Sequence, residues 1–185
     1  MTDSEFAAAL QSLGSRLVTA AIDRRAYYAA LAQLLHARFR TSRVNIWRLM
    51  AAPGTSARVL ECVAEYDPSP LSAPARGGLS EKEFAPYLEV LARQGVYVSP
   101  DTLSDGVLEP MRDGYLVPGL VEALMDAAIT INGVVVGVVC CEEIGRQRVW
   151  MQLEVTAMRR SIATVNVHLA RLQADDDRAG LPFSV

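Results

Sequence analysis

Two apolar segments joined by Asn132-Gly133 constrain the fold of this chain more than any other part of the sequence. Residues 127–131 and 134–141 are rich in β-branched side chains and lie on either side of this dipeptide. Asparagine followed by glycine readily places two successive residues at positive φ, as a two-residue type I′ turn requires. We therefore expect an antiparallel hairpin here. Its second strand is apolar on both faces, which is typical of a strand in the middle of a sheet.

The composition of the chain excludes several classes of function. The chain has 185 residues, 51% of them hydrophobic, and a formal net charge of −3, which argues against an electrostatic nucleic-acid binder. It has no uninterrupted apolar run of about 18 residues, so we expect no membrane span. The acidic N-terminus lacks the pattern of a signal peptide. Three cysteines in predicted strands indicate reduced thiols, so we expect a cytoplasmic protein.

The order of the expected elements indicates the fold class. Hairpins and helices are segregated along the chain, which favours an α+β fold with an antiparallel sheet. We divide the chain into an N-terminal dimerisation helix (1–23), one domain that includes a long C-terminal helix (24–174) and a flexible tail (175–185). The predicted helices cover residues 4–23, 24–40, 80–93 and 149–174, and the predicted strands cover 43–50, 58–66, 95–98, 127–131 and 134–141.

The first and last predicted helices each carry a narrow apolar stripe. Its members recur at spacings of three and four: Phe6, Leu10, Leu13 and Leu17, and then Met158, Ile162, Val165, Leu169 and Leu172. Such stripes are rarely left in water. They can cover each other within one protomer or join a symmetric partner in a four-helix bundle. Because Ala157, Ser161 and Thr164 are small enough for another helix to approach, we expect a homodimer through these helices.

Several short segments, in this order and spacing, resemble those of a GAF domain, the small-molecule sensor fold of signalling proteins. They are residues 42–47, 60–67, 84–87, 112–116 and 133–142, followed by 148–150 with Glu154. The resemblance covers about residues 25–170. It implies a GAF-like (profilin/PAS-like) sheet of six antiparallel strands with helices on both faces. It also implies a ligand pocket on one face, roofed by residues 67–118, and dimerisation through the terminal helices.

The cofactors and activities known in that family find no matching residues here. Haem-binding relatives place a histidine near the pocket, whereas residues 37–167 contain none. Bilin-binding relatives need a pocket cysteine with a neighbouring histidine, and the loops contain neither. The cyclic-nucleotide motif begins Asn-Lys, but the residue immediately before Lys82, the only lysine, is not an asparagine. The enzymes that reduce free methionine sulfoxide use loop cysteines, which residues 67–118 lack. We expect no cofactor, no metal and no enzymatic activity, and we interpret Cys140 and Cys141 as packing residues.

The resemblance and the clustering of polar groups before the hairpin suggest a ligand site formed by Trp47, Tyr87, Asp101, Arg112 and Tyr115. An arginine near a tyrosine could clamp a carboxylate or phosphate, and the other aromatic side chains could form walls. The alternative is that Arg112 pairs with a neighbouring acid on a short helix and that Tyr115 packs under the sheet.

The function that we predict is a non-enzymatic small-molecule sensor or regulatory module. Pocket occupancy would alter the packing of the terminal helices and thereby the output of a separate signalling protein. Two alternatives remain. One is an oxidoreductase of the type that reduces free methionine sulfoxide, and the other is a dimerisation module that binds no ligand. The pocket volume separates the sensor from the last alternative, because a useful ligand needs about 300 Å³.

Overall fold

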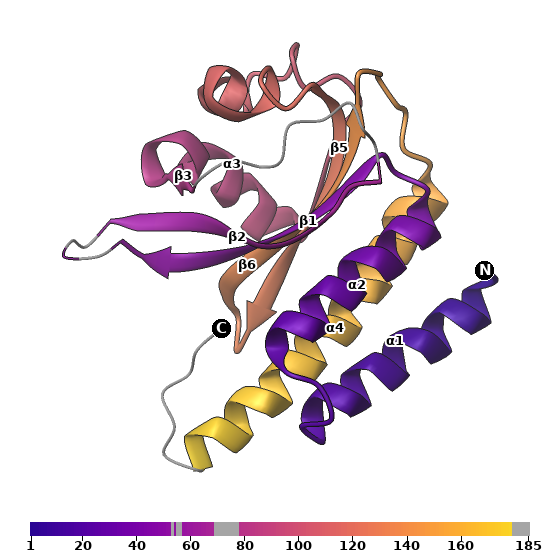
Figure 1. Cartoon of the computed structure of the whole chain (residues 1–185). Coiled ribbons are helices and arrows are strands. Elements are labelled where there is room, and N and C mark those ends of the chain that lie inside the picture. The colour runs from indigo at the N-terminus through magenta and orange to yellow at the C-terminus, as the bar shows by residue number, and fades with distance from the viewer. Residues whose placement is uncertain (53, 55–56, 69–77, 179–185) are drawn as a thin grey trace.

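The protein is built on a sheet of six antiparallel strands in the order β3-β2-β1-β6-β5-β4 (Figure 1). The computed structural model describes residues 1–52, 54, 57–68 and 78–178. Helices lie on both faces of the sheet, so the predicted α+β class is confirmed. The strands are β1 (Arg43–Ala51), β2 (Arg58–Tyr66), β3 (Leu79–Ser80), β4 (Val96–Ser99), β5 (Val121–Ile131) and β6 (Val134–Ile144).

The predicted hairpin forms the centre of the sheet. Asn132 and Gly133 have φ angles of 51° and 79°, so both residues occupy the left-handed region that the turn requires. β5 and β6 pair antiparallel on either side of them, and β6 also pairs with β1. β5 begins at Val121 rather than at Ala127. The sequence prediction missed its first half because acidic side chains interrupt the apolar pattern there.

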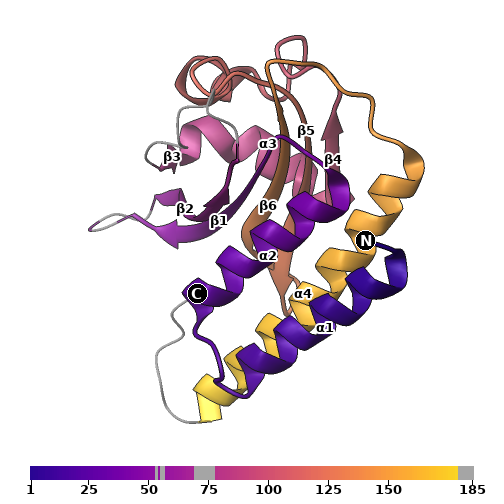
Figure 2. The ribbon, with the colours of Figure 1, turned by 45° about the vertical axis from the view of Figure 1, so that its right-hand side comes forward.

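A layer of three helices covers one face of the sheet. These are α1 (Asp3–Val18), α2 (Arg24–Phe39) and α4 (Gln152–Arg178). α2 and α4 pack on the strands, and α1 is the outermost helix, lying over both of them (Figure 2). The apolar stripe of α1 is buried between α2 and α4, so the two predicted seams cover each other within one protomer. Along the described residues, no helix combines the length and the apolar character needed to cross a membrane.

The opposite face is covered by α3 (Glu81–Gln94), the 3-10 turn η1 (Glu109–Met111) and the π-helical turn η2 (Arg112–Leu116). The sheet therefore separates two apolar cores. Successive side chains of β6 alternate between them: Cys140 lies on the α3 face and Cys141 on the α4 face, as strand geometry requires.

The ends of some elements differ from the sequence prediction. α1 ends at Val18 rather than at residue 23, and the positive φ of Ala20 marks the turn that follows. α4 continues through Arg178, so the first residues of the predicted tail belong to the helix; the remainder, 179–185, lies outside the described residues. Most of the predicted loop 67–78 also lies outside them. The short strand β3 was not predicted.

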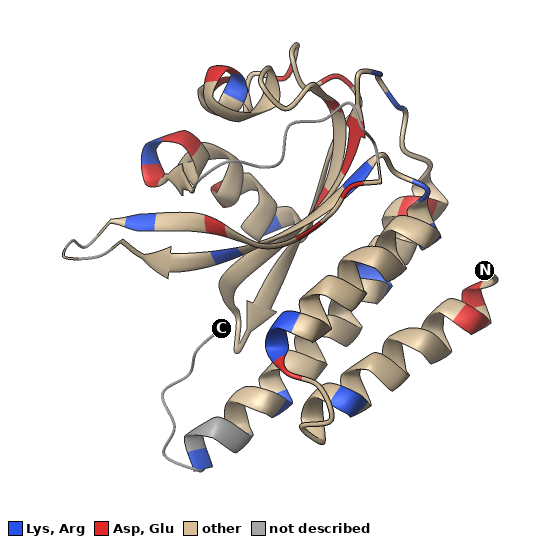
Figure 3. Ribbon diagram, viewed as in Figure 1, with Lys and Arg blue, Asp and Glu red and all other residues tan. Residues whose placement is uncertain are grey.

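Charged residues of both signs are spread over the helices and strands in the view of Figure 3. Several of them lie within the sheet itself, where the side chains of Arg43, Glu142 and Glu143 are buried. Charges are rarely buried unless they are paired. We therefore expect partners for these three residues where the start of β1 lies beside the end of β6.

Candidate functional site

A small cavity lies between the sheet and the elements that cover its α3 face. Its volume is about 20 Å³, which is room for about one water molecule and far below the ~300 Å³ of a typical ligand site. The side chains of the described residues therefore leave almost no space in this cavity. Those that matter below are Trp47, Tyr87, Met111, Tyr115, Asp126 and Glu142.

The structure brings together three of the five predicted site residues. Trp47, Tyr87 and Tyr115 line the cavity, and the rings of Trp47 and Tyr115 meet edge to face with centroids 5.4 Å apart. Arg112 is not among the lining residues, because its Nη2 donates to the carbonyl of Leu103 at 2.8 Å. Ligand binding by any of the five residues stays a prediction.

Asp101 also lies outside the cavity lining, in the turn that follows β4. Its Oδ1 accepts from the amide nitrogens of Leu103 and Ser104 at 3.2 and 3.3 Å, and its Oδ2 accepts from the Ser104 hydroxyl at 2.8 Å. Asp101 therefore stabilises the turn by hydrogen bonds to residues two and three positions ahead.

A buried ion pair that the sequence analysis did not find stands beside the cavity. Arg43 on β1 and Glu142 on β6 are directly opposite, with Nε and Oε2 2.6 Å apart and side chains 0% and 1% exposed. Burial lowers the pKa of Arg43, but the charge and hydrogen bond of Glu142, together with Tyr115 and Glu65, outweigh it and raise that pKa, so Arg43 stays charged. Breaking such a pair from one side destabilises a fold by about 3–5 kcal/mol.

Two further groups complete the hydrogen bonding of Glu142. The Tyr115 hydroxyl donates to Oε1, and the Asn45 side-chain amide donates to Oε2 at 3.1 Å and to the Tyr115 hydroxyl at 3.0 Å. A tyrosine from the roof of the cavity is therefore bonded to a carboxylate of the central strand. We call Arg43, Asn45, Tyr115 and Glu142 the pocket-face network.

A second buried acid on this face, Asp126, is only partly satisfied. Its side chain is 2% exposed, and its Oδ2 accepts from the Tyr87 hydroxyl at 2.5 Å. Its Oδ1 has no hydrogen-bond partner. An unsatisfied buried polar atom typically lowers the stability of a fold by about 1–3 kcal/mol. Burial raises the pKa of Asp126 well above its ordinary value of 3.8, which favours the neutral acid.

The residue after Glu142 reaches the opposite face. Glu143 is fully buried there, and its Oε2 accepts from the Ser42 hydroxyl at 2.8 Å and from Arg146 Nε at 2.7 Å. Its Oε1 pairs with Arg148 Nη1. Arg148 is thus tied to the central strand on the side of the helical layer.

Arg148 also holds the ends of two helices. Its Nη2 donates to the Phe39 carbonyl at the end of α2 at 2.9 Å and to Glu154 Oε1 in the first turn of α4 at 2.5 Å. Its guanidinium carbon lies 4.2 Å from the ring centroid of Trp150. We call Glu143, Arg148 and Glu154 the helix junction, because they join α2, β6 and α4.

The thiols of the protein are poor nucleophiles in this structure. Burial raises the pKa of Cys62 to about 12 and the pKa values of Cys140 and Cys141 well above their ordinary value. The thiolate is the reactive form, so these groups are largely unreactive at neutral pH. Among the described residues, no group of three or more His, Cys, Asp and Glu side chains is arranged to hold a metal ion.

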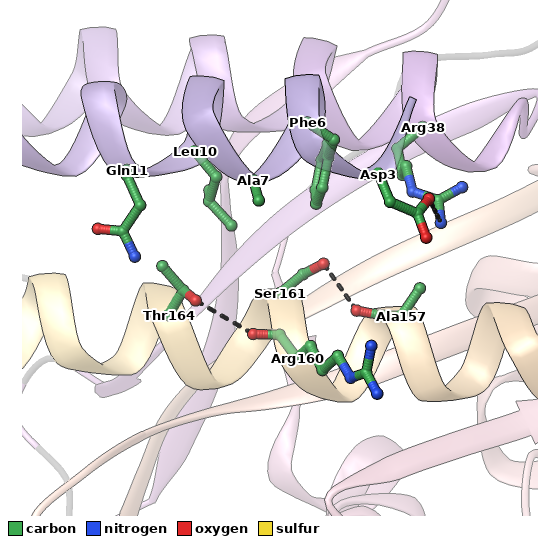
Figure 4. A pocket seen from close by; sticks show the side chains of 10 residues that line it. All are labelled: Asp3, Phe6, Ala7, Leu10, Gln11, Arg38, Ala157, Arg160, Ser161 and Thr164. Carbon is green, nitrogen blue, oxygen red and sulfur yellow. Dashed lines mark hydrogen bonds and ion pairs between the residues drawn. The ribbon is translucent and has the colours of Figure 1, made fainter. Parts of the chain in front are cut away.

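A larger groove of about 170 Å³ runs along the outside of the helical layer, between α1 and α4 (Figure 4). Phe6 and Leu10 point from α1 toward α4, and Ala157, Ser161 and Thr164 line the other wall. Arg38 closes one end, where its Nη2 pairs with Asp3 Oδ1 at 2.8 Å.

The protein is similar in structure to solved sensor domains, although the sequences have diverged widely. The blue-light-absorbing form of the Thermosynechococcus elongatus PixJ GAF domain superimposes with a TM-score of 0.71 at 20% identity, covering 85% of this chain and 91% of that one. The phycocyanobilin-bound GAF domain of a cyanobacterial phytochrome has a TM-score of 0.75 at 15% identity, covering 95% and 97%. No family model matches the sequence, and no curated protein matches it either.

Proposed function

The chain has the fold of GAF domains, and from that premise we propose that it is a regulatory module rather than an enzyme. The module couples the state of its pocket face to the packing of its terminal helices. One observation carries the proposal: the consecutive residues Glu142 and Glu143 join the pocket-face network and the helix junction through a single strand.

The proposed coupling begins at Tyr115. This residue lines the cavity and bonds Glu142, so a ligand that displaces its ring also removes a donor from a buried carboxylate. Glu142 then repositions with β6, and Glu143 moves with it because the two share a peptide unit. Arg148 transmits that movement to α2 and α4, to which it is directly bonded. Packed interiors respond to such changes by switching between discrete arrangements.

Substitution of Tyr115 tests this coupling. Tyr115→Phe keeps the ring and removes the hydroxyl, so we expect faster amide hydrogen exchange at the start of α4 and at the end of α2, read by mass spectrometry. Tyr97→Phe is the matched control, since the Tyr97 hydroxyl lies on the same face but donates to Asp105 at 2.6 Å. If both variants change only the exchange of their own surroundings, the sheet does not couple the two faces.

We further propose that two copies associate through the outer surface of α1 and α4, and that a separate signalling protein reads the arrangement of these helices. The groove between the helices supports this proposal, because its walls combine apolar side chains with the small residues Ala7, Ala157 and Ser161. Small side chains let another helix approach closely.

A second candidate function is favoured by the cavity volume. A cavity of about 20 Å³ suits a dimerisation module that binds no ligand. Native mass spectrometry of freshly purified protein separates the two functions. A retained small molecule, or one that binds on titration, supports the sensor, whereas an unliganded dimer that binds nothing supports the dimerisation module.

The ligands named for the neighbouring structures are not proposed for this chain. The phytochrome domain is described as bound to phycocyanobilin. The cavity here is far too small for such a chromophore, and residues 67–118 contain no cysteine for attachment.

A further inference from the structure

A row of polar side chains crosses the pocket face of the sheet at one level. Tyr97 on β4 lies opposite Asp126 on β5, Asp126 lies opposite Cys140 on β6, and Cys140 lies opposite Asn45 on β1. Directly opposite residues of antiparallel strands bring their side chains into contact. The apolar core on this face is therefore interrupted by one continuous polar row, part of which borders the cavity.

The hydrogen bonds of this row leave a surplus of acceptors. The hydroxyls of Tyr87 and Tyr115 already donate to Asp126 and Glu142, and the Asn45 amide nitrogen donates twice. The side-chain oxygen Oδ1 of Asp126 and that of Asn45 accept nothing. The neighbour of Asp126 across the strands is the Cys140 thiol, which is a weak donor. When Asp126 is ionised, the missing partner is therefore a group that donates hydrogen bonds.

The charges on this face also favour a donor that is positive. Among the residues that line the cavity, Asp126 and Glu142 are acidic and none is basic. The nearby Arg43 is engaged by Glu142. An anionic ligand would lie against two carboxyl groups, whereas a cation would find Asp126 and three aromatic side chains that attract positive charge.

We propose that this cavity recognises a protonated primary amine, whose ammonium group donates to Asp126 among Trp47, Tyr87 and Tyr115. The inference rests on the proposed sensor function, since it names the chemistry of the sensed ligand. An ammonium group is close to a water molecule in size, so it fits the volume of about 20 Å³. The body of the amine displaces the apolar part of the roof at Met111, next to Tyr115.

The pH dependence of binding follows from the groups around Asp126. Those that face it are Tyr87 from α3, Tyr97 from β4, and Cys140 and Glu142 from β6. Burial disfavours the charged carboxylate in the empty cavity, and an ammonium ion restores a partner for it. Amine binding therefore releases a proton from Asp126, and the affinity rises with pH until that group is ionised without ligand.

Titration with methylammonium chloride tests the inference, with amide nuclear magnetic resonance shifts of the ¹⁵N-labelled full chain as the readout. So small a probe binds with a dissociation constant on the order of millimolar or weaker. We expect saturable shifts centred on Asp126 and Cys140 that strengthen as pH rises. Tetramethylammonium chloride at the same concentration carries the charge without a donor and should leave these amides unchanged.

The variant Asp126→Asn keeps the shape of the neutral acid and removes the negative charge. We expect it to raise the dissociation constant for methylammonium by about tenfold or more, because the ammonium group loses the carboxylate charge that it pairs with. Absence of saturable shifts in the parent protein, equal shifts with tetramethylammonium or unchanged affinity in Asp126→Asn overturns the inference. Should Asp126→Asn fail to fold, a methylammonium affinity that does not rise with pH in the parent protein has the same consequence.

The inference and the proposed function can fail separately. If methylammonium binds as expected but Tyr115→Phe leaves hydrogen exchange in α4 unchanged, the amine site stands and the coupling is wrong. If Tyr115→Phe changes exchange in α4 but no amine binds, the coupling stands and the ligand is not an amine.

Discussion

Glu142 and Glu143 are consecutive residues of β6 whose carboxylates are buried on opposite faces of the same sheet. Glu142 pairs with Arg43 beside the cavity, and Glu143 pairs with Arg148 beside the helices. Because the two residues share a peptide unit, a displacement of the β6 backbone beneath one carboxylate also displaces the other. Two adjacent charges thus connect the two layers that cover the sheet.

Removal of the Arg148 guanidinium should loosen the helix junction. Arg148→Met leaves the buried Glu143 with Ser42 and Arg146 only, so we expect a loss of about 2–4 kcal/mol in the free energy of unfolding, measured with urea. Arg146→Met is the matched control, because Arg146 contacts the same carboxylate but its side chain is 65% exposed. We expect a loss of about 1 kcal/mol or less there. Equal losses in the two variants would show that Arg148 has no special role.

A methyl group at Gly137 should destabilise the centre of the sheet. A Cβ atom there would lie 2.4 Å from the backbone carbonyl oxygen of Trp47 on the neighbouring strand, which cannot give way without disturbing β1. We expect Gly137→Ala to lower the free energy of unfolding by about 1–3 kcal/mol. Gly106→Ala is the control, since nothing lies within 4 Å of that position. Unchanged thermal stability of Gly137→Ala would contradict the close approach of β1 and β6.

The raised pKa of Asp126 predicts a specific pH dependence of stability. In the window that begins near the ordinary pKa of 3.8 and ends at the raised value, the folded protein binds more protons at this site than the unfolded chain does. The contribution of Asp126 is therefore fully present below the window and is lost as pH rises through it. Asp126→Asn removes that loss. Urea unfolding at a series of pH values should show the variant gaining stability relative to the parent as pH increases; a constant difference would contradict the raised pKa.

The proposed dimer should respond to charges on the outer surface of α1 and α4. Ala7 is exposed and Thr164 half-buried, and both line the groove, so Ala7→Glu with Thr164→Glu should separate the copies and leave the fold intact. Leu13 and Ile162, by contrast, are buried within one protomer, so their replacement by glutamate should unfold the chain. Sedimentation reports the mass, and circular dichroism reports the fold. If the Ala7→Glu, Thr164→Glu protein remains folded and sediments like a dimeric parent, the interface lies elsewhere.

Local patterns in the sequence predicted the elements, but pairing across the sheet decided the site. The dipeptide Asn132-Gly133 and the apolar runs beside it were enough to predict the hairpin, because turn and strand preferences act over a few residues. The pairing of Arg43 with Glu142 depends on the alignment of strands about a hundred residues apart in the chain. No local pattern contains that alignment, and so the buried ion pair was missed.

The predicted site residues also show that local sequence predicts some features and not others. Trp47, Tyr87 and Tyr115 reach the cavity because large aromatic side chains on its boundary elements turn inward to be buried. Asp101 and Arg112 lie close to these elements in sequence, yet their polar groups bond nearby backbone atoms instead. Proximity along the chain predicted their neighbourhood but not the direction of their side chains. Asp126 was missed because its acidic side chain made the first half of β5 resemble a loop.

A double-mutant cycle between Tyr115→Phe and Arg148→Met tests the coupling across the sheet most directly. The two side chains lie on opposite faces, and a path between them runs through Glu142 and Glu143. Unfolding free energies of the parent, both single variants and the double variant give the interaction energy. Coupling predicts a value of about 0.5 kcal/mol or more, whereas losses that add to within about 0.3 kcal/mol would show that the two faces are independent.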